Sequence, residues 1–582
     1  MKRLLSGDLQ LFIAFFFISI CSEKAFAQYN NLWIPDTLSG TTFNLTVKDT
    51  FAQLRAGNQT ITGSVNHDNF WGPTLFLRKG DTVHVNVMNK LNDSTTIHWH
   101  GMHLPAIMDG GPHQIIPPGT LWQPYWKVTN QAAMLWYHPH LMDMTLQQLV
   151  AGVGGFIIIR DSLEATLPLP RTYGVDDIPL ALTSRTYDAN NQFEIPDNNK
   201  VSQYGDYMLT NGTPNAQVSL PKQVVRLRIL NGEVMRGYNL GFSDNRTFYI
   251  IGNDQGLLNA PVALKNIYLM PGERIEILVD LGSDAVGSSI DMEAFNKNQP
   301  MGFPGVEPNK TGINGSLLND TNFTVLHINV ANTTAHPITV IPTKLANNVY
   351  WKASDATVQR LFNVTNASGT GLNQFIYDNV TYNFHTINQK VNQNAIEEWT
   401  IADNFFSSHT LHIHDVQFKI VWRNKCTNGF PDTVEAYEGG WKDNVFVPAG
   451  DTVSVVAKFS DLADSLHPFM YHCHMVNHEQ GGMMGQFTVE NNTSVNEVSN
   501  VNTDYTIYPN PAAEKLFISF ADPNMQAYYI RITDMVGRTK YMLPSPQLNN
   551  GIDVSTLAPG VYLLQLTDNR TKAVITKKFI KE

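Results

Sequence analysis

Cysteine is scarce in this chain: three occur among 582 residues, namely Cys21, Cys426 and Cys473. So few cysteines exclude a disulfide framework, and stability must therefore come from large hydrophobic cores or from bound metal. Charged residues are also few, at 16%, against 43% hydrophobic residues. The formal net charge is −11 and the chain has no long basic run, which argues against a nucleic-acid partner.

Long apolar runs are the second absence. The run "LFIAFFFISI" at 11–20 follows two basic residues and precedes the small-residue sequence "AFA" at 25–27. It is shorter than the roughly 17 residues that a spanning helix needs. This pattern predicts a signal peptide over residues 1–27 and a mature chain that begins at Gln28. No later segment is long and apolar enough to span a bilayer, so we expect no transmembrane span in the mature protein.

Long helical periodicity is lacking as well, whereas strand patterns are abundant. Typical examples are "DTVHVNVMN" at 81–89, "VVRLRIL" at 224–230, "RIEILVDL" at 274–281 and "DTVSVVAKF" at 451–459. Each alternates or is rich in Val and Ile, and turn-forming residues bound most of them. The sequence therefore predicts an all-β protein made of β-sandwich domains.

Three repeated units are visible in the first 490 residues or so. "PGERIEILVDL" at 271–281 matches "AGDTVSVVAKF" at 449–459, and "LWYHPH" at 135–140 matches "FMYHCH" at 469–474. A third phrase occurs in all three units, but the middle copy has Asn239 and Gly241 where the other two have histidines. We therefore expect the middle unit to carry no metal ligands.

Histidines gather in four clusters, which hold ten of the 18 in the chain: "HWH" at 98–100, "HPH" at 138–140, "HTLHIH" at 409–414 and "HCH" at 472–474 with His478. On a strand, residues i and i+2 point to the same face, so each H-x-H presents two imidazoles to one side. Four such pairs give eight imidazoles. A structural zinc site needs only four ligands, so this number favours a cluster of several metals.

The cysteine between two of these histidines has a separate role. Cys473 must point away from His472 and His474 and so serves a different metal, with the backbone as a short electron path between the two sites. A thiolate, two imidazoles and a distant thioether form the blue-copper ligand set. Cys473, His478 and Met483 supply three of these groups, and His409 can supply the fourth.

With these motifs in order, the sequence resembles a three-domain multicopper oxidase, of the bacterial branch that includes cuprous oxidases, spore-coat laccases and bilirubin oxidases. The resemblance covers roughly residues 30 to 490 and extends to "DGGPHQIIPPG" at 109–119, "LTNG" at 209–212 and "GWKDNVFV" at 440–447. It implies four copper ions. The type 1 ion takes His409, Cys473 and His478 with Met483 axial, the type 2 ion takes His98 and His412, and the type 3 pair takes His100, His138, His140, His414, His472 and His474.

The same resemblance implies three cupredoxin-like Greek-key β-sandwich domains, and the change to a polar composition after about residue 490 predicts a linker followed by a small separate β domain. We expect a signal peptide at 1–27, cupredoxin domain 1 at 28–165, domain 2 without copper ligands at 166–340, domain 3 with the type 1 copper at 341–490, a polar linker at 491–504 and a small C-terminal β-sandwich at 505–582. In the C-terminal region 505–582, the phrases "YPNP" at 508–511 and "LAPGVYLLQL" at 557–566 resemble a type IX secretion sorting domain. That implies a partner in the type IX machinery and a secreted or cell-surface protein; an accessory binding domain is the alternative.

The activity implied is the oxidation of a reductant in one-electron steps, coupled to the four-electron reduction of O₂ to water. The absence of a dense methionine cluster before His409 favours a phenolic or other aromatic reductant, and oxidation of Cu(I) is the alternative within this class. An electron-transfer or copper-binding cupredoxin without turnover is the alternative of another class. Asp109 and Glu479 match acidic positions that deliver protons in this branch; the competing interpretation makes each a solvated surface acid.

Overall fold

The computed structural model describes residues 29–197, 202–312, 314–366, 375–405, 407–424, 429–460, 462–491, 505–520, 528–535, 537–544, 551–568 and 574–582. The predicted signal peptide, Cys426 and the predicted linker from residue 492 on lie outside these ranges. Within them, no helix has the length and apolar character required to cross a membrane.

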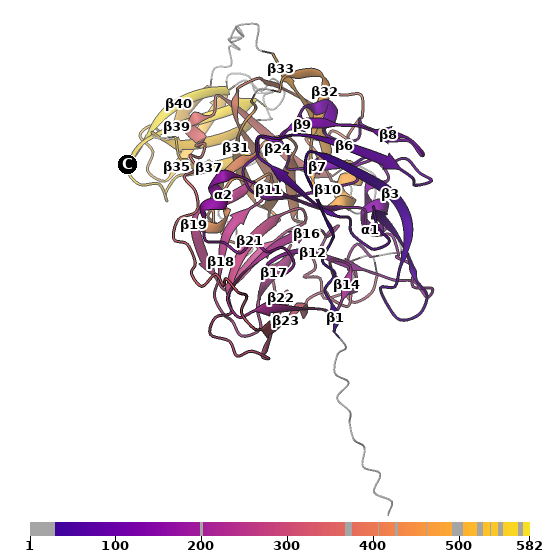
Figure 1. Cartoon of the computed structure of the whole chain (residues 1–582). Helices are drawn as coiled ribbons and strands as arrows, with labels where there is room; N and C mark the ends of the chain where they lie inside the picture. Colours follow the sequence, from indigo (N-terminus) through magenta and orange to yellow (C-terminus); the bar gives the residue numbers. More distant parts are fainter. Residues whose placement is uncertain are drawn as a thin grey trace, which may run out of the picture.

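The described chain is almost entirely β-structure, arranged in eight sheets, so the predicted all-β fold class is confirmed. Its three α-helices are short: α1 (Thr145–Ala151), α2 (Ser162–Thr166) and α3 (Val476–Gln480). The 3₁₀ segments are η1 (Ala106–Met108), η2 (Ala353–Asp355) and η3 (Ala436–Gly439). Figure 1 shows the sheets in chain order by colour.

Two sheets form the first unit. One has the order β2 (Thr37–Ser39), β5 (Thr74–Arg78), β11 (Gly155–Arg160), β10 (Met134–His138) and β7 (His98–His100). The other has β4 (Thr60–Val65), β3 (Thr42–Ala52), β6 (Thr82–Asn89) and β8 (Leu121–Trp122), with β9 (Tyr125–Lys127) on β6. In β6 the alternation seen in the sequence places Val83, Val85 and Val87 in the core.

The middle unit also has two sheets. The first has the order β1 (Asn30–Asn31), β15 (Ala216–Pro221), β23 (Asn322–Ala331), β22 (Ser289–Phe295), β17 (Tyr238–Phe242) and β20 (Asn266–Leu269). The second has β14 (Thr213–Pro214), β13 (Tyr207–Thr210), β12 (Asp177–Arg185), β16 (Val224–Asn231), β21 (Arg274–Asp280), β18 (Phe248–Asn253) and β19 (Gly256–Leu264). The first strand of the described residues, β1, thus pairs with the middle unit through β15.

The third unit repeats this arrangement. One sheet has the order β25 (Phe375–Tyr377), β24 (Val358–Asn366), β27 (Ile396–Asp403), β31 (Thr452–Lys458) and β29 (Phe418–Arg423). The other has β26 (Gln389–Asn392), β33 (Met484–Glu490), β32 (Asp464–Cys473), β28 (His409–Ile413) and β30 (Asn444–Val447). This second sheet carries two of the four histidine clusters.

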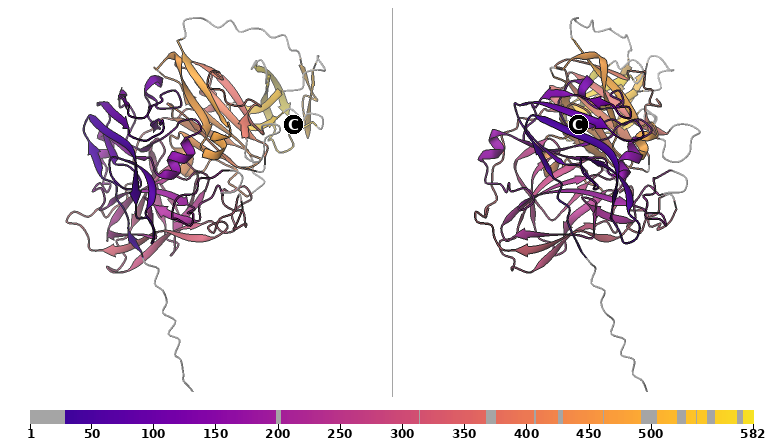
Figure 2. Two further views of the ribbon diagram at one scale, coloured as in Figure 1. Left: turned by 90° about the vertical axis from the view of Figure 1, so that its right-hand side faces the viewer. Right: turned by 45° about the vertical axis from the view of Figure 1, so that its right-hand side comes forward.

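Two small sheets make up the C-terminal region: β34 (Tyr505–Tyr508), β35 (Lys515–Phe520) and β38 (Ile552–Asp553), then β37 (Thr539–Pro544), β36 (Tyr528–Asp534), β39 (Gly560–Asp568) and β40 (Val574–Lys581). This region, in yellow, lies against the third unit (Figures 1 and 2). Arg531 of β36 forms an ion pair with Glu398 of β27, and both side chains are buried.

The cores explain how two distant histidine pairs meet. The middle unit has most of its core to itself. One large cluster of buried side chains runs from the first unit into the third and includes a few middle-unit residues, such as Leu230 and Met235. It joins Trp71 and Trp136 of the first unit to Trp399 and Cys473 of the third. Burial of this shared apolar surface brings the ends of β7 and β10 next to the ends of β28 and β32.

Candidate metal centre

Strand pairing sets the positions of the predicted ligands. In the first unit His138 of β10 is opposite His98 of β7, and in the third unit His412 of β28 is opposite His472 of β32. All ten histidines and Cys473 are buried. The expectation that each H-x-H pair lies on a strand is wrong in part, because His140, His414 and His474 follow the last residue of their strands. The strands end where the imidazoles converge. In three of the four pairs the last imidazole comes from the outgoing loop, whereas His100 is still the last residue of β7.

One group consists of His409, Cys473 and His478. The Cys473 Sγ atom lies 3.8 Å from His409 Nδ1 and 3.7 Å from His478 Nδ1, and the two nitrogens are 3.1 Å apart. Metal–nitrogen and metal–sulfur bonds of about 2.0 and 2.3 Å in a trigonal arrangement would separate N from S by about 3.7 Å. Met483 is buried in the same core cluster, and its carbonyl accepts the Cys473 N–H at 3.0 Å. The triangle therefore has the size that a single metal ion requires.

Burial sets the protonation of this group. It lowers the pKa of His478 to about 3 and the pKa of His409 well below its usual range, so both imidazoles are neutral and have a free lone pair. It raises the pKa of the Cys473 thiol to about 12. A metal that binds here must displace the thiol proton.

The other eight histidines form a second group where the first and third units meet. His140 Nε2 lies 3.0 Å from His472 Nε2, and His472 Nε2 lies 3.3 Å from His414 Nε2. His100 Nδ1 is 3.3 Å from His138 Nε2. Three sets of ring nitrogens are each close enough to share an ion: those of His98, His412 and His414, of His98, His100 and His138, and of His140, His414 and His472.

Backbone carbonyls fix which nitrogen faces the centre of this group. The Nδ1–H of His98 donates to the carbonyl of Asp109 at 3.0 Å, and that of His412 donates to the carbonyl of Asp443 at 2.8 Å. The Nδ1–H of His138 donates to the carbonyl of Pro139 at 2.9 Å. The Nε2 atoms of His98 and His412 are buried and have no hydrogen-bond partner. Unpartnered buried nitrogens are costly unless a metal binds them, so this arrangement fits metal ligation.

Asp109 and Glu479 are both buried against this group, so the surface-acid interpretation is wrong for each. The His414 Nδ1–H donates to Asp109 Oδ2 at 2.8 Å. Glu479 Oε1 lies 3.4 Å from His140 Nδ1, and Oε2 lies 3.3 Å from His472 Nδ1. Burial alone would raise the pKa of the Glu479 carboxyl, but His140 and His472 outweigh it and lower the pKa to about 2. A cavity of about 90 Å³ reaches Glu479 and is lined also by Met142, Asp143, Tyr382 and Met484.

A third acid, Asp443, was missed by sequence reasoning. Its Oδ1 lies 3.3 Å from His100 Nε2, and its backbone carbonyl accepts from His412 as above. Asp109, Glu479 and Asp443 thus each contact two of the eight imidazoles. The sequence did contain a signal for Asp443, because this residue lies in the phrase "GWKDNVFV" that is part of the family resemblance. It was missed because no residue of that phrase is a predicted metal ligand.

Comparison with known proteins agrees with this donor set. Residues 46–164 and 354–493 match family models described as multicopper oxidase. A cell division protein FtsP of Xenorhabdus nematophila is 30% identical over 424 residues, which cover 72% of this chain and 83% of that protein. The chain belongs to the multicopper oxidase family. Membership implies copper binding, and the histidine clusters described above are suited to copper as imidazole and thiolate ligands.

Two further similarities place the chain within this family. A multicopper oxidase of Staphylococcus haemolyticus is 29% identical over 432 residues, covering 73% of this chain and 83% of the relative. The solved structure of a laccase-like multicopper oxidase from Ochrobactrum aligns with a TM-score of 0.68 at 26% identity, covering 79% of this chain and all of that one. Residues 506–582 match a separate model, a secretion system C-terminal sorting domain.

Proposed function

We propose that this protein is an exported oxidase that couples four one-electron oxidations of a reductant to the reduction of O₂ to water. The observation that carries the proposal is the position of Cys473 in one donor group and of its neighbour His472 in the other, with the His474 ring 4.9 Å from the His100 ring. Bound copper would accept single electrons at the first group and reduce O₂ at the second. A single strand end would then join the two sites through the Cys473 backbone.

The proposed ligands divide as follows. His409, Cys473, His478 and Met483 would hold type 1 copper, and His98 and His412 would hold type 2 copper. His100, His138, His140, His414, His472 and His474 would hold the type 3 pair. The convergence of eight buried imidazoles supports more than one ion in this group, beside the ion at Cys473, because a single ion would leave most of these nitrogens without a partner.

Two acids are placed to move protons. Asp109 accepts from His414, and Glu479 lies between His140 and His472 beside the small cavity described above. A carboxyl in such a position can accept a proton from solvent and pass it inward. We assign both to proton delivery during O₂ reduction.

An aromatic reductant is the first candidate. The Ochrobactrum relative is described as having oxidase activity towards lignin model compounds, which supports a phenolic reductant here. Phe375 lies edge-on to His409 and to His478, with ring centroids 4.5 and 4.8 Å away. Phe375 is itself buried, so it separates these two type 1 ligands from solvent.

Oxidation of Cu(I) is the second candidate, and one observation favours it. His409 and His478 are only 1% and 0% exposed, so a bulky donor does not touch either imidazole. A cell-division role, which the name of the Xenorhabdus relative raises, would use neither donor group. A cupredoxin without turnover would use the Cys473 group but leave the eight other histidines unexplained.

Oxygen uptake by the copper-loaded protein separates these alternatives. We expect uptake with a phenol, measured against Cu(I), a bilin and an aromatic amine at equal concentration. Uptake with Cu(I) alone would select the second candidate. Copper loading with no uptake from any donor would overturn the proposed oxidase and leave a copper-binding protein.

The C-terminal domain supports export. Its match to a secretion sorting domain favours passage through the type IX machinery to the cell surface or the medium. A chain that lacks residues 505–582 should stay inside the envelope, and fractionation of the producing cells measures this. Normal release of the shortened chain would contradict the assignment.

A further inference from the structure

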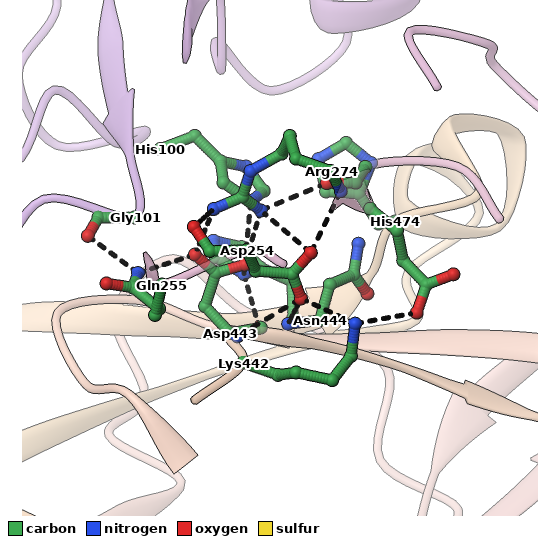
Figure 3. Close-up of polar contacts among 12 residues, drawn as sticks. His100, Gly101, Asp254, Gln255, Arg274, Lys442, Asp443, Asn444 and His474 are labelled. Carbon is green, nitrogen blue, oxygen red and sulfur yellow. Dashed lines mark hydrogen bonds and ion pairs between the residues drawn. The ribbon is translucent and has the colours of Figure 1, made fainter. Parts of the chain in front are cut away.

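The middle unit carries none of the predicted ligands, yet it reaches the eight-histidine group through Arg274, the first residue of β21. The Arg274 guanidinium forms two parallel bonds with Asp443, NH1 to Oδ1 and NH2 to Oδ2, each 2.6 Å long. It also donates to the carbonyls of Asp254 and Gly272, at 2.8 and 3.1 Å. Figure 3 shows this arrangement, with Arg274 above Asp443 and beside His100. Guanidinium geometry matches a carboxylate in this way, and an ammonium cannot.

The carboxylate held by Arg274 meets the first unit as well. Gln255 donates to Asp443 Oδ2 at 2.6 Å and to the carbonyl of Gly101 at 2.7 Å. Gly101 directly follows His100 and has a φ of 87°. A Cβ atom there would lie 2.6 Å from Asp443 Oδ2, so only glycine lets the backbone of this motif approach the network.

Asp254 fixes the backbone of the third unit from the same side. Its carboxylate accepts from the N–H groups of Asp443 and Asn444, at 3.4 and 3.3 Å, and pairs with Lys442 at 2.9 Å. Glu273 also pairs with Lys442, at 3.1 Å. The residues from 442 to 444 are thereby held by the middle unit on one side (Figure 3). On the other side Asp443 contacts His100 and His412.

The charges of this network do not cancel. Three carboxylates, those of Asp254, Glu273 and Asp443, face two cations, Arg274 and Lys442, and all five side chains are buried. One carboxylate of the network therefore has no cation of its own. An uncompensated buried charge is costly, and a metal held by the neighbouring imidazoles would supply the missing positive charge.

We infer that Arg274 is a positioning residue for the eight-histidine copper group: by holding Asp443 in place, it orients His100 through the Asp443 carboxylate and His412 through the Asp443 carbonyl. The inference rests on the proposed function. It gives the ligand-free middle unit a part in building the copper centre. Direct ligation of copper by Asp443 fits less well, although its oxygen lies close enough to His100 and His412, because the guanidinium already occupies both carboxylate oxygens.

The test uses the full chain with Arg274→Lys, which keeps the charge but loses one of the two parallel bonds. Arg228→Lys is the matched control. Arg228 lies on β16 in the same sheet, is equally buried and pairs with Asp177 through two bonds of 2.6 and 3.0 Å, but contacts no predicted ligand. Asp443→Asn serves as a second probe, because it keeps the shape and removes the charge.

Copper content, the blue absorbance and EPR spectra report the copper classes separately. We expect Arg274→Lys and Asp443→Asn to weaken type 3 binding, which His100 serves, about 10- to 100-fold, as changes to residues that orient a ligand do. Arg274→Lys should also weaken type 2 binding through His412, whereas Asp443→Asn keeps the backbone carbonyl that His412 contacts. The blue absorbance should remain in both variants, and in Asp443→Asn the fraction of copper visible by EPR should rise, since a coupled copper pair is silent. Arg228→Lys should leave all three readouts unchanged.

Two results would overturn the inference alone: parent-like copper content and EPR spectra in both probes, or an equal loss of every copper class in Arg274→Lys and Arg228→Lys. A parent protein that takes up no copper would overturn the proposed function and this inference together. If the parent is an active oxidase but its type 3 signal does not respond to Arg274→Lys, the proposed function stands and the role of Arg274 is rejected.

Discussion

The two candidate copper groups are built in opposite ways. The group of His409, Cys473 and His478 comes from one unit and lies in an apolar core, with Phe375 packed against both imidazoles. The eight-histidine group draws its ligands from the first and third units and is surrounded by three buried acids. The middle unit holds one of these acids, Asp443, through Arg274. The first group therefore depends on the fold of one β-sandwich, whereas the second forms only where the first and third units pack together, with the middle unit in contact with Asp443.

Cys473→Ser should have the largest effect, because it removes one group and spares the other. A hydroxyl is a hard and weakly acidic ligand, and blue copper depends on a soft thiolate. We expect loss of the blue colour, about three copper ions per chain in place of four, and phenol oxidation at background level. Copper analysis and oxygen uptake measure this. A variant that stays blue or oxidises phenols at the parent rate would refute the assignment.

Asp109→Asn and Glu479→Gln should act on the eight-histidine group only. An amide keeps the shape of the side chain but does not accept a proton, so O₂ reduction should slow about 100-fold. The blue copper should still be reduced by substrate at the parent rate, as stopped-flow absorbance would show. Asp284→Asn is the control, because Asp284 forms a half-buried ion pair with Arg246 in the middle unit. Unchanged turnover across pH would remove either acid from proton delivery.

The affinity for copper should depend on pH differently in the two groups. Because burial raises the pKa of the Cys473 thiol to about 12, the metal-free protein holds this proton throughout the neutral range, and copper must displace it. The apparent affinity of the type 1 site should therefore rise about tenfold per pH unit. His478, with its pKa lowered to about 3, releases no proton there. Copper titrations against a competing chelator, followed by blue absorbance at two pH values near neutrality, measure this change in affinity. The pH dependence of the chelator itself is subtracted. A flat response would contradict a protonated thiol.

Arg531→Met should change stability with the smallest effect on activity. It leaves Glu398 of β27 buried without its partner, and breaking a buried pair costs about 3 kcal/mol. We expect a lower midpoint of thermal unfolding and oxidation rates within about twofold of the parent. Arg538→Met is the control, since its side chain is 73% exposed and a surface pair contributes about 0–1 kcal/mol. Equal midpoints for the two variants would mean that the C-terminal domain does not stabilise the third unit.

The same contact bears on deletion of the chain after residue 495. The sequence predicts that such a protein still folds and oxidises, because the composition changes there. In the structure, the C-terminal domain covers Leu361 and Ala402 with Tyr529 and Met542, so deletion also exposes apolar surface on the sheet that contains β27. We expect a folded, active protein with a lower unfolding midpoint. Loss of type 1 copper on deletion would show that the two regions are more closely coupled.

Much of the site was determined by the sequence itself. The period of two along a strand is a local property, so the opposite directions of Cys473 and its two histidine neighbours followed from the order of the residues alone. The all-β class likewise followed from alternation, as in β6. Repeated phrases identified the units and the one without ligands, because each unit folds by the same local rules.

The tertiary structure decided what depends on contacts between distant residues. Which nitrogen of each imidazole faces the centre is set by carbonyls such as that of Asp443, 31 residues from His412 in the chain. The burial of Asp109 and Glu479, which turns ordinary acids into partners of the ligands, arises from the shared core of two units. Arg274 meets Asp443 across 169 residues. No local pattern encodes such a pairing, because it is created only when separate β-sandwiches pack together and leave charged groups a single set of partners.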